Sequence, residues 1–215
     1  MADLYLVRHG ETIINAQERF NGGGVDSPLT AKGVAGARQV HDLLTPLHFD
    51  RIISSPMPRA MTTTELIVGA DKPVTIDPRL REMRLGDWDG QLLSDWAGTD
   101  EFIKYRHHMM QWDYARFHAE GYQHMVQRAQ AAFDDAAVAV GPQGRGLVVS
   151  HGIVLTIMAN VLNGTPLDHA RDSGQLANTS VTVLRKQANK WRILVWNVTP
   201  ANLTALTPAQ RALFD

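Results

Sequence analysis

The chain has 215 residues, of which 44% are hydrophobic, and its 21 Lys and Arg residues nearly balance 22 Asp and Glu residues, giving a net charge of −1. This length and composition suit one folded domain with a substantial core and exclude a mainly disordered chain. Proteins that bind nucleic acid or anionic membranes normally carry a basic excess, so we expect neither partner.

The chain contains no cysteine, which excludes disulfides, thiolate metal sites and a cysteine nucleophile. Its first residues lack the basic start and apolar stretch of a signal peptide. The longest apolar stretch, residues 147–162, is interrupted by polar residues and is short for a membrane span of about 20 residues. We therefore expect a cytoplasmic protein without a membrane segment.

The first third of the chain alternates strand and helix patterns. A short apolar run predicts a strand at residues 4–7, and a glycine-rich loop follows at residues 21–24. Apolar residues at helical spacing predict a helix over residues 28–44, and residues 49–54 form a second apolar run. A helix is expected to begin at Pro58, where the missing N–H costs nothing.

The rest of the chain continues this alternation around one unusual segment. Residues 74–76 predict a third strand, and residues 125–140 and 153–162 predict helices on either side of a strand at residues 147–149. Two more strands, expected to form an antiparallel hairpin, precede a short terminal helix; they cover residues 180–184 and 191–196, and the helix covers 207–214.

Residues 86–123 hold over half of the aromatic residues and show no strand pattern. We interpret this segment as loops and short helices inserted into a single domain that spans residues 1–215. The aromatic side chains either form a small core of their own or line a substrate pocket, and the sequence does not decide between these. Strands that alternate with helices predict a three-layer α/β/α sandwich with a mainly parallel sheet.

Two predicted strands end in the same way, with a histidine followed by a glycine. The first strand runs into Arg8, His9 and Gly10, and the fourth runs into His151 and Gly152. Because parallel strands end at one edge of a sheet, both imidazoles are expected there. A neutral imidazole can attack phosphorus through one ring nitrogen while the other donates to a backbone carbonyl.

Phosphoryl transfer also needs cations on the phosphoryl oxygens and an acid for the leaving oxygen. Arg8 adjoins His9, and Arg59 follows the second strand at a predicted helix start. Glu82 is our candidate acid, and later the base for water. Its arginine neighbours favour the ionised carboxylate, whereas a bound phosphate dianion favours the protonated form; we expect the phosphate to prevail in the occupied site.

Two other patterns have simpler interpretations. The three glycines at residues 22–24 suggest a phosphate cradle, but no Gly-Lys-Ser/Thr follows, so a flexible loop is the plainer reading. His107 and His108 are adjacent and therefore cannot face one metal ion from a helix. We expect these two, with His118 and His124, to be solvated, and we expect no metal site.

These motifs resemble the histidine phosphatase superfamily, in its phosphoglycerate mutase-like branch. The segment from Leu6 to Thr12 matches the opening signature of that family. The other matches lie in the family order and cover nearly the whole chain: Asn15, Arg19, Phe20 and Gly22, then Ser54 to Ala60, Arg81 to Gly90 and Val149 to Gly152.

The resemblance implies a three-layer α/β fold with an inserted cap, which residues 86–123 would form. It implies that His9 becomes phosphohistidine, that Arg8, Arg59 and His151 bind the phosphoryl oxygens, and that Glu82 donates the proton. Three further residues are assigned to phosphate or substrate binding, namely Asn15, Asn21 and Gly22. No cofactor or metal is implied, and the partner is a small phosphorylated substrate.

Departures from the mutase pattern favour a phosphatase. Mutases of this branch carry a paired-arginine segment in the cap, a tyrosine three residues after the acid and Gly-Asn-Ser after the second histidine. This chain has no arginine pair near residues 104–108, Leu85 in place of the tyrosine, and Gly152, Ile153 and Val154 after His151. We therefore expect a metal-independent phosphomonoesterase. A cofactor-primed mutase and a non-catalytic phospholigand-binding module are the alternatives.

Overall fold

The computed structural model describes residues 1–215 and contains one six-stranded sheet with the strand order β3-β2-β4-β1-β5-β6. Strands β1 to β4 run parallel to one another, whereas β5 is antiparallel to β1 and to β6. The mainly parallel sheet and the hairpin are therefore as predicted. The strands are β1 (Ala2–Arg8), β2 (Arg51–Ser54), β3 (Thr75–Ile76), β4 (Arg145–Ser150), β5 (Val181–Gln187) and β6 (Lys190–Val198).

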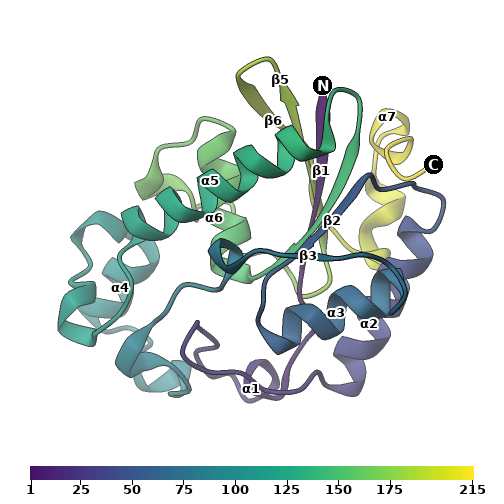
Figure 1. Ribbon diagram of the computed structural model, residues 1–215. Helices are drawn as coiled ribbons and strands as arrows, with labels where there is room; N and C mark the ends of the chain where they lie inside the picture. Colours follow the sequence, from purple (N-terminus) through teal and green to yellow (C-terminus); the bar gives the residue numbers. More distant parts are fainter.

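Helices cover both faces of this sheet, which confirms the predicted three-layer sandwich (Figure 1). Helices α2 (Ala31–Leu44) and α3 (Pro58–Val68) lie on one face. Helices α5 (Tyr122–Val140) and α6 (Gly152–Leu162) lie on the other and pack against each other.

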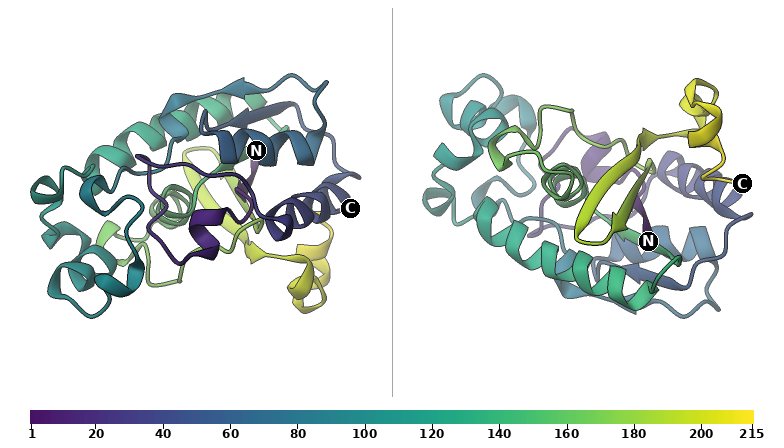
Figure 2. Two further views of the ribbon diagram at one scale, coloured as in Figure 1. Left: turned by 90° about the horizontal axis from the view of Figure 1, so that it is seen from below. Right: turned by 90° about the horizontal axis from the view of Figure 1, so that it is seen from above.

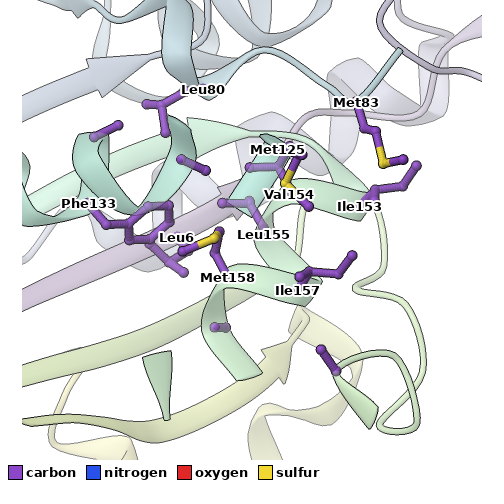
Figure 3. Packing of buried hydrophobic residues seen from close by; sticks show 14 of the residues in the cluster. Leu6, Leu80, Met83, Met125, Phe133, Ile153, Val154, Leu155, Ile157 and Met158 are labelled. Carbon is purple, nitrogen blue, oxygen red and sulfur yellow. The ribbon is translucent and has the colours of Figure 1, made fainter. Parts of the chain in front are cut away.

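The period-2 alternation of β1 explains why both faces need cover. Leu4 and Leu6 join the hydrophobic cluster beneath α5 and α6, whereas Tyr5 and Val7 join the cluster beneath α2 and α3. Figure 3 shows the first cluster, where Leu6 lies among side chains of α5 and α6. Nine of the eleven residues of α6 are buried, so this helix is enclosed on nearly all sides.

The segment 86–123, expected to form the cap, contains α4 (Asp100–His107) and several 3₁₀ turns. Trp88 is fully buried, and its ring lies within 5.5 Å, centroid to centroid, of rings from four other residues of this segment: Trp96, Tyr105, Trp112 and Phe117. These aromatic side chains continue the cluster beneath α5 and α6. For them, the interpretation as a core is confirmed.

Several element boundaries differ from the prediction. Helix α2 begins at Ala31 because the Thr30 hydroxyl accepts the Gly33 N–H as a helix cap, which places Pro28 outside the helix. Helix α5 begins at Tyr122, three residues before the predicted start. The predicted terminal helix shortens to α7 (Pro208–Arg211), preceded by a 3₁₀ helix, Pro200–Ala205, which was not predicted.

A short helix, α1 (Ile13–Ala16), was also not predicted. It follows β1 and lies with the glycine-rich loop across the edge of the sheet where the parallel strands end (Figure 2, left). No helix of the protein combines the length and apolarity that a membrane crossing needs.

Candidate active site

His9 and His151 lie side by side at the carboxyl ends of β1 and β4. The parallel register pairs Arg8 with Ser150, so the residues that follow are neighbours, and the His9 N–H donates to the Ser150 carbonyl at 2.9 Å. The ring centroids are 5.2 Å apart with an interplanar angle of 59°. Both rings are buried beneath the segments that cover this edge.

The His9 ring presents one defined nitrogen to the site. Its Nδ1 atom lies 2.8 Å from the Gly10 carbonyl oxygen, which can only accept, so Nδ1 carries the proton and Nε2 keeps its lone pair. Burial, followed by the charges of Arg59 and Arg8, holds the pKa of His9 well below its usual value of 6.5. His9 is therefore a neutral imidazole near pH 7, the form that acts as a nucleophile.

The main chain around His9 is fixed on both sides. The Asn178 side-chain amide donates to the His9 carbonyl at 2.9 Å, and the Gly10 N–H donates to the Thr63 hydroxyl at 2.9 Å. Asn178 lies shortly before β5, so the antiparallel strand brings a residue distant in the sequence to His9. The ring can therefore reorient only about its own side-chain torsions.

Arg59 lies in the first turn of α3 and is buried, with 1% of its surface exposed. Pro58 occupies the first helical position, as predicted, and the Arg59 guanidinium extends to His9. Its Nε–H donates to His9 Nε2 at 3.3 Å. The other N–H groups of the guanidinium donate to the loop that begins at Asn21, and Nη2 binds the Asn21 and Gly22 carbonyls.

Arg8 approaches from the other flank of the site. Its Nη1 donates to the Leu176 carbonyl at 2.6 Å, whereas its buried Nε has no hydrogen-bond partner in the protein. Burial lowers the pKa of Arg8 to about 10, which leaves the guanidinium charged at neutral pH. An unpaired charged donor beside His9 is suited to an anionic oxygen.

Glu82 is buried at the N-terminus of α6. Its carboxyl group accepts three backbone N–H groups, those of Met83 at 2.9 Å, Ile153 at 3.0 Å and Val154 at 3.3 Å. Burial raises the pKa of Glu82 above its ordinary value of 4.5, and the N–H donors with Arg59 and Arg8 only partly offset this rise. Oε2 accepts only one of these three bonds, which leaves room for a proton on that oxygen.

The arginines that neighbour Glu82 in sequence do not determine its charge. Arg79 instead binds Asp77 and Asp135, and Arg81 and Arg84 are exposed. The positive charges that act on Glu82 come from Arg8 and Arg59, which are distant in the sequence.

Asn15 and Asn21 meet through Thr12 at the start of α1. The Asn15 side-chain oxygen accepts the Thr12 N–H and hydroxyl, while the Thr12 hydroxyl accepts the Asn15 N–H. The Asn21 amide donates to both Thr12 and Asn15. With its oxygen engaged, Asn15 has its amide N–H groups available for a ligand.

The glycine-rich loop is packed rather than flexible, contrary to our expectation. A Cβ on Gly22 would lie 2.1 Å from Asp89 Oδ1, and one on Gly23 would lie 2.4 Å from the Glu82 carbonyl oxygen. Asp89 Oδ2 accepts the Gly24 N–H at 2.9 Å and the Leu85 N–H at 3.2 Å. The loop is thus tied to the segment that carries Glu82.

Several residues at the site were not assigned from the sequence. They hold the assigned groups rather than adding another charged donor, and they are Thr12, Asp26, Ser55, Thr63, Asp89 and Asn178. A polar residue directly after an apolar strand was a usable signal for Ser55. No group of three or more His, Asp or Glu side chains is placed to hold a metal ion.

Comparison with protein families matches residues 4–199 to the histidine phosphatase superfamily, branch 1. The chain belongs to this superfamily. The probable phosphoglycerate mutase GpmB of Enterobacter sp. (strain 638) is 36% identical to this chain over 202 residues, which covers 92% of this chain and 91% of the relative. The resemblance found in the sequence is therefore confirmed.

Solved structures named as phosphatases share the fold of this superfamily member. A putative alpha-ribazole-5'-P phosphatase from Escherichia coli superposes with a TM-score of 0.78 and 27% identity, covering 92% of this chain and 96% of the other. A mycobacterial glucosyl-3-phosphoglycerate phosphatase in complex with VO3 gives a TM-score of 0.82 and 25% identity, covering 92% and 99%.

Proposed function

We propose that this protein is a metal-independent phosphomonoesterase that hydrolyses small phosphorylated substrates through a phosphohistidine at His9. The observation that carries the proposal is the state of the His9 ring, which is neutral. Its Nδ1–H donates to the Gly10 carbonyl, and its Nε2 lone pair points towards Arg59. A nucleophile and a charged donor thus meet at the position that a phosphoryl group would occupy.

In the first step, Nε2 of His9 attacks phosphorus and the bond from phosphorus to the leaving oxygen breaks. Glu82 gives its proton to that oxygen, which departs as an alcohol. In the second step, Glu82 takes a proton from water, the resulting hydroxide attacks phosphorus, and the phosphorus–nitrogen bond breaks to release phosphate. The raised pKa of Glu82 supports this role, because an acid must hold its proton until the substrate arrives.

Positive charge at the site would stabilise the transition state. Arg8 offers an unpaired Nε–H, and Arg59 faces the nucleophile. A charge pair about 4 Å apart contributes on the order of 4 kcal/mol near a protein surface, so two guanidinium groups supply much of the stabilisation that a metal ion provides elsewhere.

The apolar groups near the acid favour hydrolysis over mutase activity. Leu85, Ile153 and Val154 occupy the positions where mutases carry polar side chains, and all three are buried, with at most 4% of their surface exposed. They offer no side-chain donor to a second anionic group of a phosphoglycerate. A mutase remains the second candidate, because the relative from Enterobacter bears that name.

A cavity of about 770 Å³ lies between the acid segment and the start of α5. Glu82 lines it together with apolar residues such as Met110 and Tyr114 and with a larger number of polar or charged residues, among them Arg84 and Arg128. We propose that the leaving group extends from the acid into this cavity, where it can meet both kinds of surface.

Incubation with an aryl phosphate in the presence of a chelator tests the proposal. The wild-type protein is expected to release phosphate, and an alkaline quench followed by mass spectrometry is expected to find one phosphoryl group on His9. His9→Ala is expected to lose both, with activity reduced by at least about 1,000-fold. Asp42→Asn, on an exposed position of α2, serves as the control.

Four outcomes would overturn parts of the proposal. Hydrolysis that stops with the chelator would refute metal independence, and equal hydrolysis by His9→Ala would refute the nucleophile. Isomerisation of 3-phosphoglycerate in the presence of the bisphosphate primer, at a rate far above hydrolysis, would establish the mutase instead. Phosphate binding without turnover would identify a non-catalytic binding module.

A further inference from the structure

All five N–H groups of the Arg59 guanidinium are occupied within the protein. Nε donates to His9 Nε2 at 3.3 Å, and Nη2 donates to the Asn21 carbonyl at 3.3 Å and the Gly22 carbonyl at 3.0 Å. Nη1 donates to the Val25 carbonyl at 2.8 Å and the Asp26 carboxylate at 2.6 Å. A phosphoryl oxygen can therefore bind Arg59 only by replacing one of these acceptors.

The five bonds differ in length according to the side of the guanidinium. The two longest, both 3.3 Å, involve Nε and Nη2, whose N–H groups form the edge that faces His9. The two shortest involve Nη1, on the side away from the nucleophile. The edge that faces His9 thus has the acceptors that are most readily exchanged, while the far side is firmly held.

We propose that Asp26 is a positioning residue, which anchors Arg59 by Nη1 so that the Nε and Nη2 edge stays directed at the phosphoryl group on His9. This inference rests on the proposed function, because it assigns Arg59 to the phosphoryl oxygens. The oxygens replace His9 Nε2 and the Asn21 carbonyl as acceptors, and Asp26 retains its bond throughout.

Asp26 is the one carboxylate that pairs with this guanidinium. The Arg59 side chain has no exposed surface, whereas that of Asp26 is 26% exposed, so the ion pair connects a buried cation to the edge of the site. Glu82 directs its oxygens to the backbone N–H groups of Met83, Ile153 and Val154. Without Asp26, the guanidinium keeps only carbonyl acceptors on its far side and is free to tilt.

Two measurements on Asp26→Asn and Asp26→Ala test this role, with Asp42→Asn as the charge control. The first is the Kd for inorganic phosphate, measured by calorimetry, which needs no turnover. The second is kcat and KM for an aryl phosphate. Asp26→Ala is expected to weaken phosphate binding and to lower kcat/KM by about 10- to 100-fold, the range for losing a hydrogen bond to a charged group. Asp26→Asn keeps an oxygen acceptor and is expected to lose less.

A double-mutant cycle with Arg59→Ala separates positioning from general damage to the loop. If Asp26 acts through Arg59, Asp26→Asn has no further effect on phosphate affinity once Arg59 is absent. An equal loss in both backgrounds would overturn the proposal. Tighter phosphate binding by Asp26→Asn would also overturn it, because the carboxylate would then be a competitor for Arg59.

The failure of this inference is distinguishable from the failure of the proposed function. A wild-type protein that binds phosphate in an Asp26-dependent manner without hydrolysing esters refutes the enzyme and keeps the positioning role. A wild-type enzyme whose phosphate affinity and kcat/KM are unchanged by Asp26→Asn and Asp26→Ala refutes the positioning role alone. Thermal unfolding of each variant verifies that the compared proteins are folded.

Discussion

The hydroxyl oxygen of Ser55 lies 2.7 Å from Nε2 of His151, where the chain leaves β2. The same oxygen accepts the Met57 N–H at 3.3 Å and keeps a hydrogen that it can donate to His151. In the tautomer that accepts this hydrogen at Nε2, the ring proton is on Nδ1, which is buried and has no partner in the protein. Under the proposed function, this tautomer gives His151 an N–H donor for a phosphoryl oxygen.

Ser55→Ala is expected to lower kcat/KM for an aryl phosphate by about tenfold, because the ring proton of His151 is no longer fixed on Nδ1. Steady-state kinetics measures the effect. Ser54→Ala is the matched control, since the Ser54 hydroxyl contacts the Ser55 carbonyl and Thr64 but neither histidine. Equal losses in the two variants would contradict a specific role for Ser55.

Glu82→Gln is expected to affect substrates unequally. An alkyl phosphate needs a proton on its leaving oxygen and should be hydrolysed about 100- to 10,000-fold more slowly, whereas a nitrophenyl phosphate should lose much less. Parallel rate measurements on the two esters test this. A uniform loss on both would show that Glu82 does not protonate the leaving oxygen.

The pH profile of kcat/KM is expected to fall on its alkaline side as Glu82 ionises. The pKa of Glu82 is raised by burial, so the protonated form persists above pH 4.5, and it is lost as the pH rises through that raised value. The pKa of His9 is well below 6.5, so the decline of kcat/KM on the acidic side, where His9 becomes protonated, is expected well below that pH. In Glu82→Gln the alkaline decline should disappear; its persistence would assign the decline to another group.

Asp89→Asn is expected to change the pH dependence of stability. Burial raises the pKa of Asp89 from 3.8 to about 6, so the folded state holds a proton that the unfolded state releases over that range. Charging Asp89 therefore costs the wild-type protein stability as the pH rises from about 4 to about 6, and the cost is constant above it. The Tm of Asp89→Asn relative to wild type should rise over this window and then level. A constant difference would contradict the assignment.

Gly23→Ala is expected to reduce both stability and activity. Its Cβ would lie 2.4 Å from the Glu82 carbonyl oxygen, so the loop or the acid segment must move. Overpacking of this kind typically costs about 1–3 kcal/mol. Denaturant unfolding and aryl phosphate kinetics measure the two effects. An unchanged denaturant midpoint would show that the loop can move to accept the added methyl group without loss of stability.

The positions of both histidines could be predicted because the decisive information is local. Each follows an apolar strand, and parallel strands of one sheet end at one edge. The start of α3 was similarly encoded by Pro58. Glu82 has no such local signal, since its place at the N-terminus of α6 depends on backbone N–H groups 71 and 72 residues away.

The supporting contacts were beyond the reach of sequence patterns. Asp26 meets Arg59 across 33 residues, and Asn178 meets His9 across 169, so neither spacing reports on a contact. The four residues of α1 are too few to show a helical period. Three consecutive glycines predict flexibility from the sequence alone, whereas in the structure they permit close approach of the loop to Asp89 and Glu82.

The enclosure of α6 has a consequence for how substrate preference changes in this chain. Glu82 is hydrogen-bonded to the N-terminus of α6, and this helix is buried on nearly all sides. The carboxyl group therefore cannot shift its position to suit esters of different size. Under the proposed function, each ester must instead bring its bridging oxygen to one fixed point. Substitutions in residues 86–123 would then change which esters bind without changing the position of the proton donor.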